Sequence, residues 1–91
     1  MPRPRIKKYI EGTPAVYYFK PQGIPLRELQ EIILSSEEFE ALRLKNIEKI
    51  DQNQSALVMK TSQSTFQRIL SSAYQKISLA IVKGLAIRIE H

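Results

Sequence analysis

Six polar side chains follow one another closely between residues 62 and 68. They are Ser62, Gln63, Ser64, Thr65, Gln67 and Arg68. Short hydroxyl, amide and guanidinium groups at the start of a helix can hydrogen-bond the edges of bases in a DNA major groove, where Gln suits adenine and Arg suits guanine. The Ser62 hydroxyl and the amides of the first helical turn could also hold a phosphate. These side chains predict a recognition helix that begins beside Ser62 and binds duplex DNA.

Positive charge lies at both ends of the chain. The net charge is +5, and the first eight residues contain four basic side chains and no acid: Arg3, Arg5, Lys7 and Lys8. Between Asp51 and Glu90 every charged side chain is basic. Such a surface suits a polyanion, because each neutralised phosphate releases counterions. We expect the amino-terminal arm, Lys60 and Lys76 to contact the DNA backbone or the minor groove, although solvated surface lysines would give the same pattern.

Composition excludes several other functions. At 91 residues the chain forms one compact domain at most. It contains no cysteine and a single histidine, at position 91, so we expect no metal site, no cofactor and no enzyme. The acidic cluster of Glu37, Glu38 and Glu40 is interpreted as charge at a helix amino terminus. No membrane span or signal peptide is predicted, and the expected location is the cytoplasm.

The elements that position the polar segment are predicted next. All five prolines fall within residues 1–25, which we interpret as a basic, extended arm with a short strand within residues 15–19. Residues 26–91 form the predicted helical domain. Leu26, Leu29, Ile32 and Ile33 have the spacing of a short amphipathic helix. A second helix begins with a capping box of Ser35 and Glu38 and ends near Lys49, and either Leu44 or Ile47 faces inward.

Two further helices complete the predicted bundle. The third begins at Asp51 or Gln52 and ends near Met59. The fourth begins after Ser62 and ends at Gly84, and its inward face comprises Phe66, Ile69, Leu70, Ala73, Ile77 and Ile81. Residues 85–89 alternate as a strand that pairs either with residues 17–19 or with a second chain. The predicted fold is therefore mainly α, a small helical bundle with an extended arm and short β segments near both ends.

The third and fourth helices together suggest a helix-turn-helix over about residues 52–81. Ala56 is placed where the two helices cross, with Met59, Phe66 and Ile69 buried around it. Lys60 occupies the turn position at which glycine is usual, so it must accept a left-handed backbone or change the turn. A plain helical hairpin with a solvent-exposed polar face is the alternative.

Four segments resemble a family of small prokaryotic proteins, the predicted DNA-binding UPF0251 proteins, which contain domain of unknown function 134. The segments are Met1-Pro2-Arg3-Pro4-Arg5, Tyr18-Phe19-Lys20-Pro21-Gln22-Gly23-Ile24-Pro25, Glu38-Phe39-Glu40-Ala41-Leu42-Arg43-Leu44 and Ser64-Thr65-Phe66-Gln67-Arg68-Ile69-Leu70. The resemblance implies a helix-turn-helix like region four of sigma factors, and a role in transcription. Lys60 departs from the family at its turn glycine, and Leu57 and Val58 stand where polar residues are usual.

The leading hypothesis is a sequence-specific binder of double-stranded DNA that regulates transcription. We expect a homodimer, because one short helix contacts few base pairs and paired half-sites multiply specificity. The alternative is an adaptor that docks on a protein of the transcription machinery through Leu57, Val58 and residues 17–19. An RNA binder that stacks bases on Tyr17, Tyr18 and Phe19 is the third hypothesis.

Overall fold

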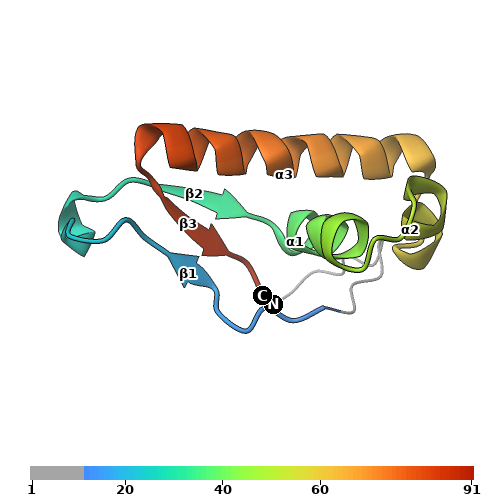
Figure 1. Cartoon of the computed structure of the whole chain (residues 1–91), viewed down its shortest axis with the longest axis horizontal. Helices are drawn as coiled ribbons and strands as arrows, with labels where there is room; N and C mark the ends of the chain where they lie inside the picture. Colours follow the sequence, from blue (N-terminus) through green and yellow to red (C-terminus); the bar gives the residue numbers. More distant parts are fainter. Residues whose placement is uncertain (1–11) are drawn as a thin grey trace, which may run out of the picture.

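The fold is seen in a computed structural model that describes residues 12–91. The long helix α3 (Gln63–Lys83) lies along one side of the molecule (Figure 1). Helices α1 (Ser36–Leu42) and α2 (Gln52–Val58) pack under its first half, and a three-stranded sheet lies under its second half. The predicted architecture, mainly helical with short strands near both ends, is confirmed.

The sheet joins the two ends of the described chain. Its strands are β1 (Tyr18–Phe19), β2 (Glu31–Leu34) and β3 (Ala86–Ile89), in the order β1-β3-β2. The central strand β3 runs antiparallel to β1 and parallel to β2. Of the two pairings predicted for the carboxy-terminal strand, the structure contains the one with residues 17–19.

The prediction of a helix from Leu26 to Ile33 is wrong. A single 3-10 turn (Leu26–Glu28, η1) is followed by β2, in which Ile32 and Leu34 face inward while Glu31 and Ile33 are exposed. The strand forms because β3 offers it a ladder from far along the sequence. A non-local pairing of this kind outweighs a local helical spacing that covers only two turns.

The second predicted helix begins with the predicted capping box. The Glu38 amide donates to the Ser35 hydroxyl at 3.0 Å, and the Ser35 amide donates to the Glu38 carboxylate at 2.8 Å. After α1 the helix widens into a π turn (Arg43–Ile47, η2). Leu44 is buried there while Ile47 is 72% exposed, so Leu44 is the inward residue.

Two apolar clusters hold the layers together. One joins α1, α2 and α3 through a fully buried pair, Met59 and Phe66, with Leu44 and Leu70 beside them. The other joins the sheet to α3 through Leu34, Ala73 and Ile89. Among the helices of residues 12–91, none has both the length and the apolar character needed to cross a bilayer.

Candidate nucleic-acid interface

The turn between α2 and α3 is sharp although its central residue is a lysine. Lys60 has φ 56°, in the left-handed region that usually favours glycine. Its amide donates to the Leu57 carbonyl and the Thr61 amide donates to the Ala56 carbonyl, both at 3.0 Å. This pair of bonds is the Schellman motif, which satisfies the last carbonyls of a helix. Lys60 therefore ends α2 in the geometry that a glycine would give.

A serine begins α3 directly after this turn. The Ser62 hydroxyl accepts a hydrogen bond from the Thr65 amide at 3.1 Å and donates one to the Thr65 hydroxyl at 2.9 Å. The predicted cap is thus confirmed. Because this hydroxyl already binds within the helix, the amides of Gln63 and Ser64 are the groups best placed to meet an anion at this end.

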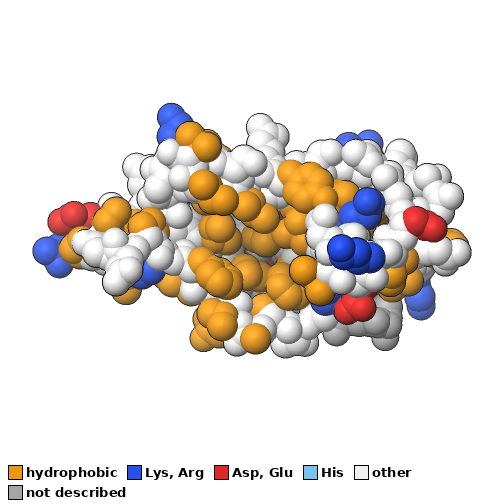
Figure 2. Space-filling model, in the orientation of Figure 1, with side chains coloured by type: hydrophobic (Ala, Val, Ile, Leu, Met, Phe, Trp, Pro, Cys, Tyr) orange, Lys and Arg blue, Asp and Glu red, His pale blue; other side chains and the backbone are white. Residues whose placement is uncertain are grey.

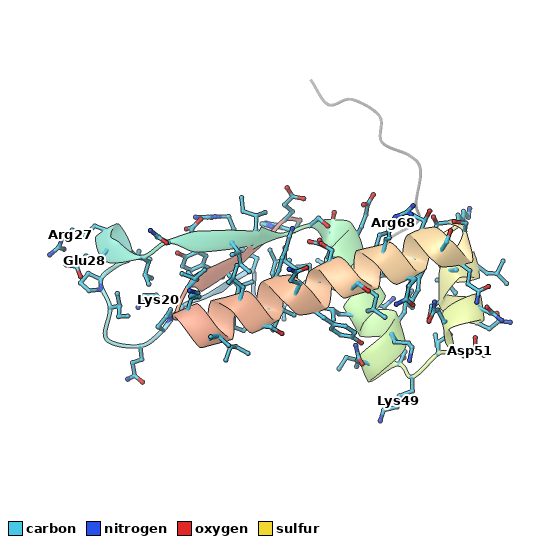
Figure 3. All side chains as sticks on the ribbon, turned by 90° about the horizontal axis from the view of Figure 1, so that it is seen from above. Lys20, Arg27, Glu28, Lys49, Asp51 and Arg68 are labelled. Atoms are coloured by element: carbon cyan, nitrogen blue, oxygen red, sulfur yellow. The ribbon has the colours of Figure 1, made fainter. Side chains whose placement is uncertain are left out.

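The predicted base-contacting side chains share one end of α3. Ser62, Gln63, Ser64, Gln67 and Arg68 are exposed there, and Thr65 is half-buried. Figure 3 shows Arg68 on the first half of α3, at the opposite end of the molecule from Lys20 and Arg27. The structure therefore brings this predicted set together on one accessible surface.

A tight apolar contact lies under this surface. Ala56, Met59 and Phe66 are buried where α2 meets α3, as predicted, and Ile69 is half-buried against them. The small side chain of Ala56 lets the two helices approach closely, and Ser55 beside it bonds the Ile50 carbonyl at 3.0 Å. The polar end of α3 consequently stands on a packed base.

The predicted cations have different surroundings. Lys60 is exposed at the turn. The Lys76 ammonium is instead bound to the Glu38 carboxylate at 2.9 Å and to the Ile33 carbonyl at 2.7 Å. Those bonds make it a link between α3, α1 and β2 rather than a group directed to a ligand. The arm residues Arg3, Arg5, Lys7 and Lys8 lie outside the described part of the chain.

Glu38 is the acceptor that holds α3 against its supports. It receives hydrogen bonds from the Ser72 hydroxyl, the Ser35 amide and the Lys76 ammonium. Burial alone would raise the pKa of this carboxyl, but the three donors outweigh burial and lower its pKa. The carboxylate therefore stays charged and fixes one face of α3.

A second buried carboxylate was missed from the sequence. Glu40 is fully buried, and its oxygens accept bonds from Arg43 at 2.8 and 3.0 Å and from the Gly12 amide at 2.9 Å. A Cβ added to Gly12 would meet the Arg43 guanidinium and the Glu40 carboxylate, so a larger residue there would force this ion pair to shift. The three-residue spacing of Glu40 and Arg43 is the signal that could have identified the pair.

The aromatic residues near the arm have contacts within the fold. The Tyr18 hydroxyl donates to Glu31 at 2.9 Å, and Arg88 binds Glu31 at 2.8 Å while lying 5.0 Å from the Tyr18 ring. The hydrogen bond to Glu31 raises the pKa of Tyr18, while the bonds from Arg88 and then Tyr18 lower the pKa of Glu31. Tyr17 stacks on His91. These contacts tie the three strands together across the sheet.

No metal centre forms within residues 12–91, where no three histidine, aspartate or glutamate side chains come together.

Comparison with known proteins identifies the family. The whole chain, residues 1–91, matches the family described as protein of unknown function DUF134. A UPF0251 protein of Caldanaerobacter subterraneus subsp. tengcongensis is 52% identical over 99% of this chain and 76% of its own length. UPF0251 proteins of Moorella thermoacetica and Dehalococcoides mccartyi are each 51% identical over 99% of this chain, which spans 60% and 77% of them. No solved structure matches. The chain belongs to the DUF134 family of UPF0251 proteins, as its four motifs suggested.

Proposed function

We propose that this protein binds double-stranded DNA sequence-specifically and regulates transcription, with α2 and α3 acting as a helix-turn-helix like that of sigma-factor region four. The observation that carries the proposal is the turn itself. Lys60 keeps the left-handed conformation and the two Schellman bonds, and Ser62 caps the next helix. A helix held this firmly relative to its neighbour is what insertion into a major groove requires.

Charge supports the same proposal. Residues 52–83 contain Lys60, Arg68, Lys76 and Lys83 and no carboxylate. Phosphates on either side of an inserted helix would therefore meet no acidic side chain of α2 or α3. Gln63, Gln67 and Arg68 supply the amide and guanidinium groups that distinguish adenine and guanine in the major groove.

The proposal is tested by selecting bound duplexes from a random pool and then measuring affinity by fluorescence anisotropy. Arg68→Ala should weaken binding to the selected site about 10- to 100-fold, because a bidentate base contact contributes about 1–3 kcal/mol. Binding to unselected duplex should fall much less. The matched control is Arg27→Ala, which removes the same charge at the far end of the molecule (Figure 3) and should change neither affinity more than about twofold.

Salt dependence gives a second test. Affinity for any duplex should fall steeply with added salt, as expected when phosphates are neutralised. Deleting residues 1–8 should weaken selected and unselected duplexes alike, because an arm that meets phosphates carries no sequence preference. If the purified protein shifts no duplex at low salt, the DNA-binding proposal is wrong.

One observation favours a second candidate function, an adaptor that docks on the transcription machinery. Leu57 is 66% exposed on α2 and borders a hollow of about 350 Å³ between α2 and α3, together with Asn53 and Thr61. An apolar side chain in that place suits a protein partner. If the protein is an adaptor, Leu57→Ser should weaken its docking on a protein partner. If it is a DNA binder, the same change should leave the salt dependence of its DNA affinity unchanged. The variant therefore distinguishes the two functions.

A further inference from the structure

An apolar face covers the side of the molecule seen in Figure 2, where hydrophobic side chains gather between the second half of α3, the sheet and η2. We define this apolar face by Phe19, Ile47, Tyr74, Ile77, Ile81 and Ile87. Two adjoining hollows of about 310 and 260 Å³ lie on it, and both are lined by Phe19 and Ile87. Tyr74 joins it at the η2 edge, where its hydroxyl pairs with Asn46.

Four of the side chains on this face are largely or partly open to solvent. Phe19, Ile47, Tyr74 and Ile81 are 53, 72, 43 and 74% exposed. Large side chains offer about 200 Å² each, so these four alone present roughly 500 Å² of apolar surface. A monomer's largest patch is commonly about 300–600 Å², and a stable interface takes about 800 Å² from each partner. Four side chains thus supply more than half of one partner's share.

We propose that this apolar face is the homodimer interface, and that its occupant is the same face of a second copy of this chain. A two-fold interface must carry both projections and recesses on one surface. Here Ile47 and Ile81 are 72 and 74% exposed where they border the two hollows, and Phe19 lines both hollows. The face therefore has the self-complementary relief that pairing with its own copy requires.

The position of the face along α3 supports the same pairing, and this step rests on the proposed DNA binding. Ile77 lies near the middle of the apolar stretch of α3, about 12 residues beyond the centre of residues 63–68. At a rise of about 1.5 Å per residue, that is about 17 Å along the helix. Two antiparallel α3 helices related by an axis at Ile77 would hold their polar ends about 34 Å apart, one turn of DNA.

The first test is the mass of the full chain in solution, measured by sedimentation equilibrium without DNA. The unaltered protein should be a dimer at about 10 µM, as expected for an interface of this size. Ile81→Glu should raise the dissociation constant at least about 100-fold, because it places a charge in the contact. Val82→Glu is the matched control: Val82 is 79% exposed, adjoins Ile81 and lines neither hollow. It should leave the dimer intact.

The second test measures the geometry of the dimer. The chain has no cysteine, so Gln67→Cys carries a single spin label per chain. The α3 arrangement above predicts a broad distance of about 30 Å between the two labels, since residue 67 lies about 15 Å from the axis. Circular dichroism shows whether each variant is folded, and all three altered residues, Gln67, Ile81 and Val82, are on the surface.

The possible results test the dimer interface, the α3 arrangement and DNA binding separately. A monomeric unaltered protein, or equal effects of Ile81→Glu and Val82→Glu, overturns the proposed interface. A label distance far from about 30 Å overturns the antiparallel α3 arrangement. Because neither measurement includes DNA, the dimer can fail while the DNA-binding proposal stands, and a dimer can form although no duplex is bound.

Discussion

The two halves of α3 differ in the side chains that they expose to solvent. In residues 63–72 the buried side is apolar and the exposed side is polar, as at Phe66 and Arg68. In residues 73–83 the exposed side is itself largely apolar, with Leu79, Ile81 and Val82 all open. The first half packs on two helices, α1 and α2, and the second half packs on the sheet. A single helix can therefore present a polar surface at one end and an apolar surface at the other.

The difference originates in what lies under each half. Phe66 and Leu70 are buried in the cluster that α2 helps to form, so the apolar side chains of this half of α3 are already covered within the fold. The sheet beneath the second half is small, with strands of two to four residues. A sheet that narrow covers only one side of α3, and the adjoining stripe that includes Ile81 stays exposed. The difference between the two halves of α3 therefore follows from the small size of the sheet under the second half.

The largest predicted effect removes the support of the first half. Phe66→Ala should lower the free energy of unfolding by about 4 kcal/mol, because it empties a fully buried site between α2 and α3. Leu79→Ala in the second half, where the side chain is 44% exposed, should cost less than about 1 kcal/mol. Urea denaturation followed by circular dichroism measures both. Equal costs would remove the contrast between the halves.

A smaller effect is expected at the junction of the halves. Glu38→Ala should cost about 2–3 kcal/mol, because Ser72, Ser35 and Lys76 all lose their acceptor. Glu28→Ala, which removes an exposed carboxylate in η1, is the control and should cost less than about 0.5 kcal/mol.

The same residue predicts a pH dependence. The pKa of Glu38 is lowered in the fold from an ordinary value of 4.5, so its contribution to stability is complete above that pH. The contribution is lost as the pH falls through the lower pKa of the folded protein. Glu38→Gln should therefore flatten the acid side of the stability curve, measured by urea denaturation at a series of pH values. An unchanged acid side would show that Glu38 is not held charged.

The smallest effect compares the two helix ends that flank α3. Lys60 and Gly84 both have positive φ, 56° and 72°. Lys60→Gly should stabilise the protein by up to about 1 kcal/mol by relieving its backbone, and Gly84→Ala should destabilise it by about 1 kcal/mol. No atom lies within 4 Å of a side chain added at Gly84, so only the backbone opposes it. Thermal unfolding of the two variants should shift in opposite directions.

The sequence predicted the parts of this fold that depend on local chemistry. The caps at Ser35 and Ser62, the end at Gly84 and the buried trio of Ala56, Met59 and Phe66 are all confirmed. Each depends on residues within a few positions of one another, or on a spacing that one helix repeats over several turns. The polar surface at residues 62–68 followed from the same local spacing.

The parts that could not be predicted depend on distant partners. The sequence alone suggests that Lys76 is an exposed cation. Its acceptor Glu38 lies 38 residues earlier, and only folding of the chain brings the two side chains together. Ile81 continues the inward spacing of α3, yet the sheet does not reach it and it is 74% exposed. The failure at β2 has the same cause, since its partner β3 is more than 50 residues away.

The placing of β3 has a consequence for the order in which the molecule folds. Within residues 12–91, β1 and β2 each pair with β3 and not with each other, so neither has a partner strand until residues 86–89 are in place. The helices can begin to associate through short loops, whereas the sheet must close loops of about 50 to 70 residues, which slows folding. We therefore expect strand formation to be the late step of folding. A cut after Gly84 would leave the first two strands without the strand that pairs with both of them.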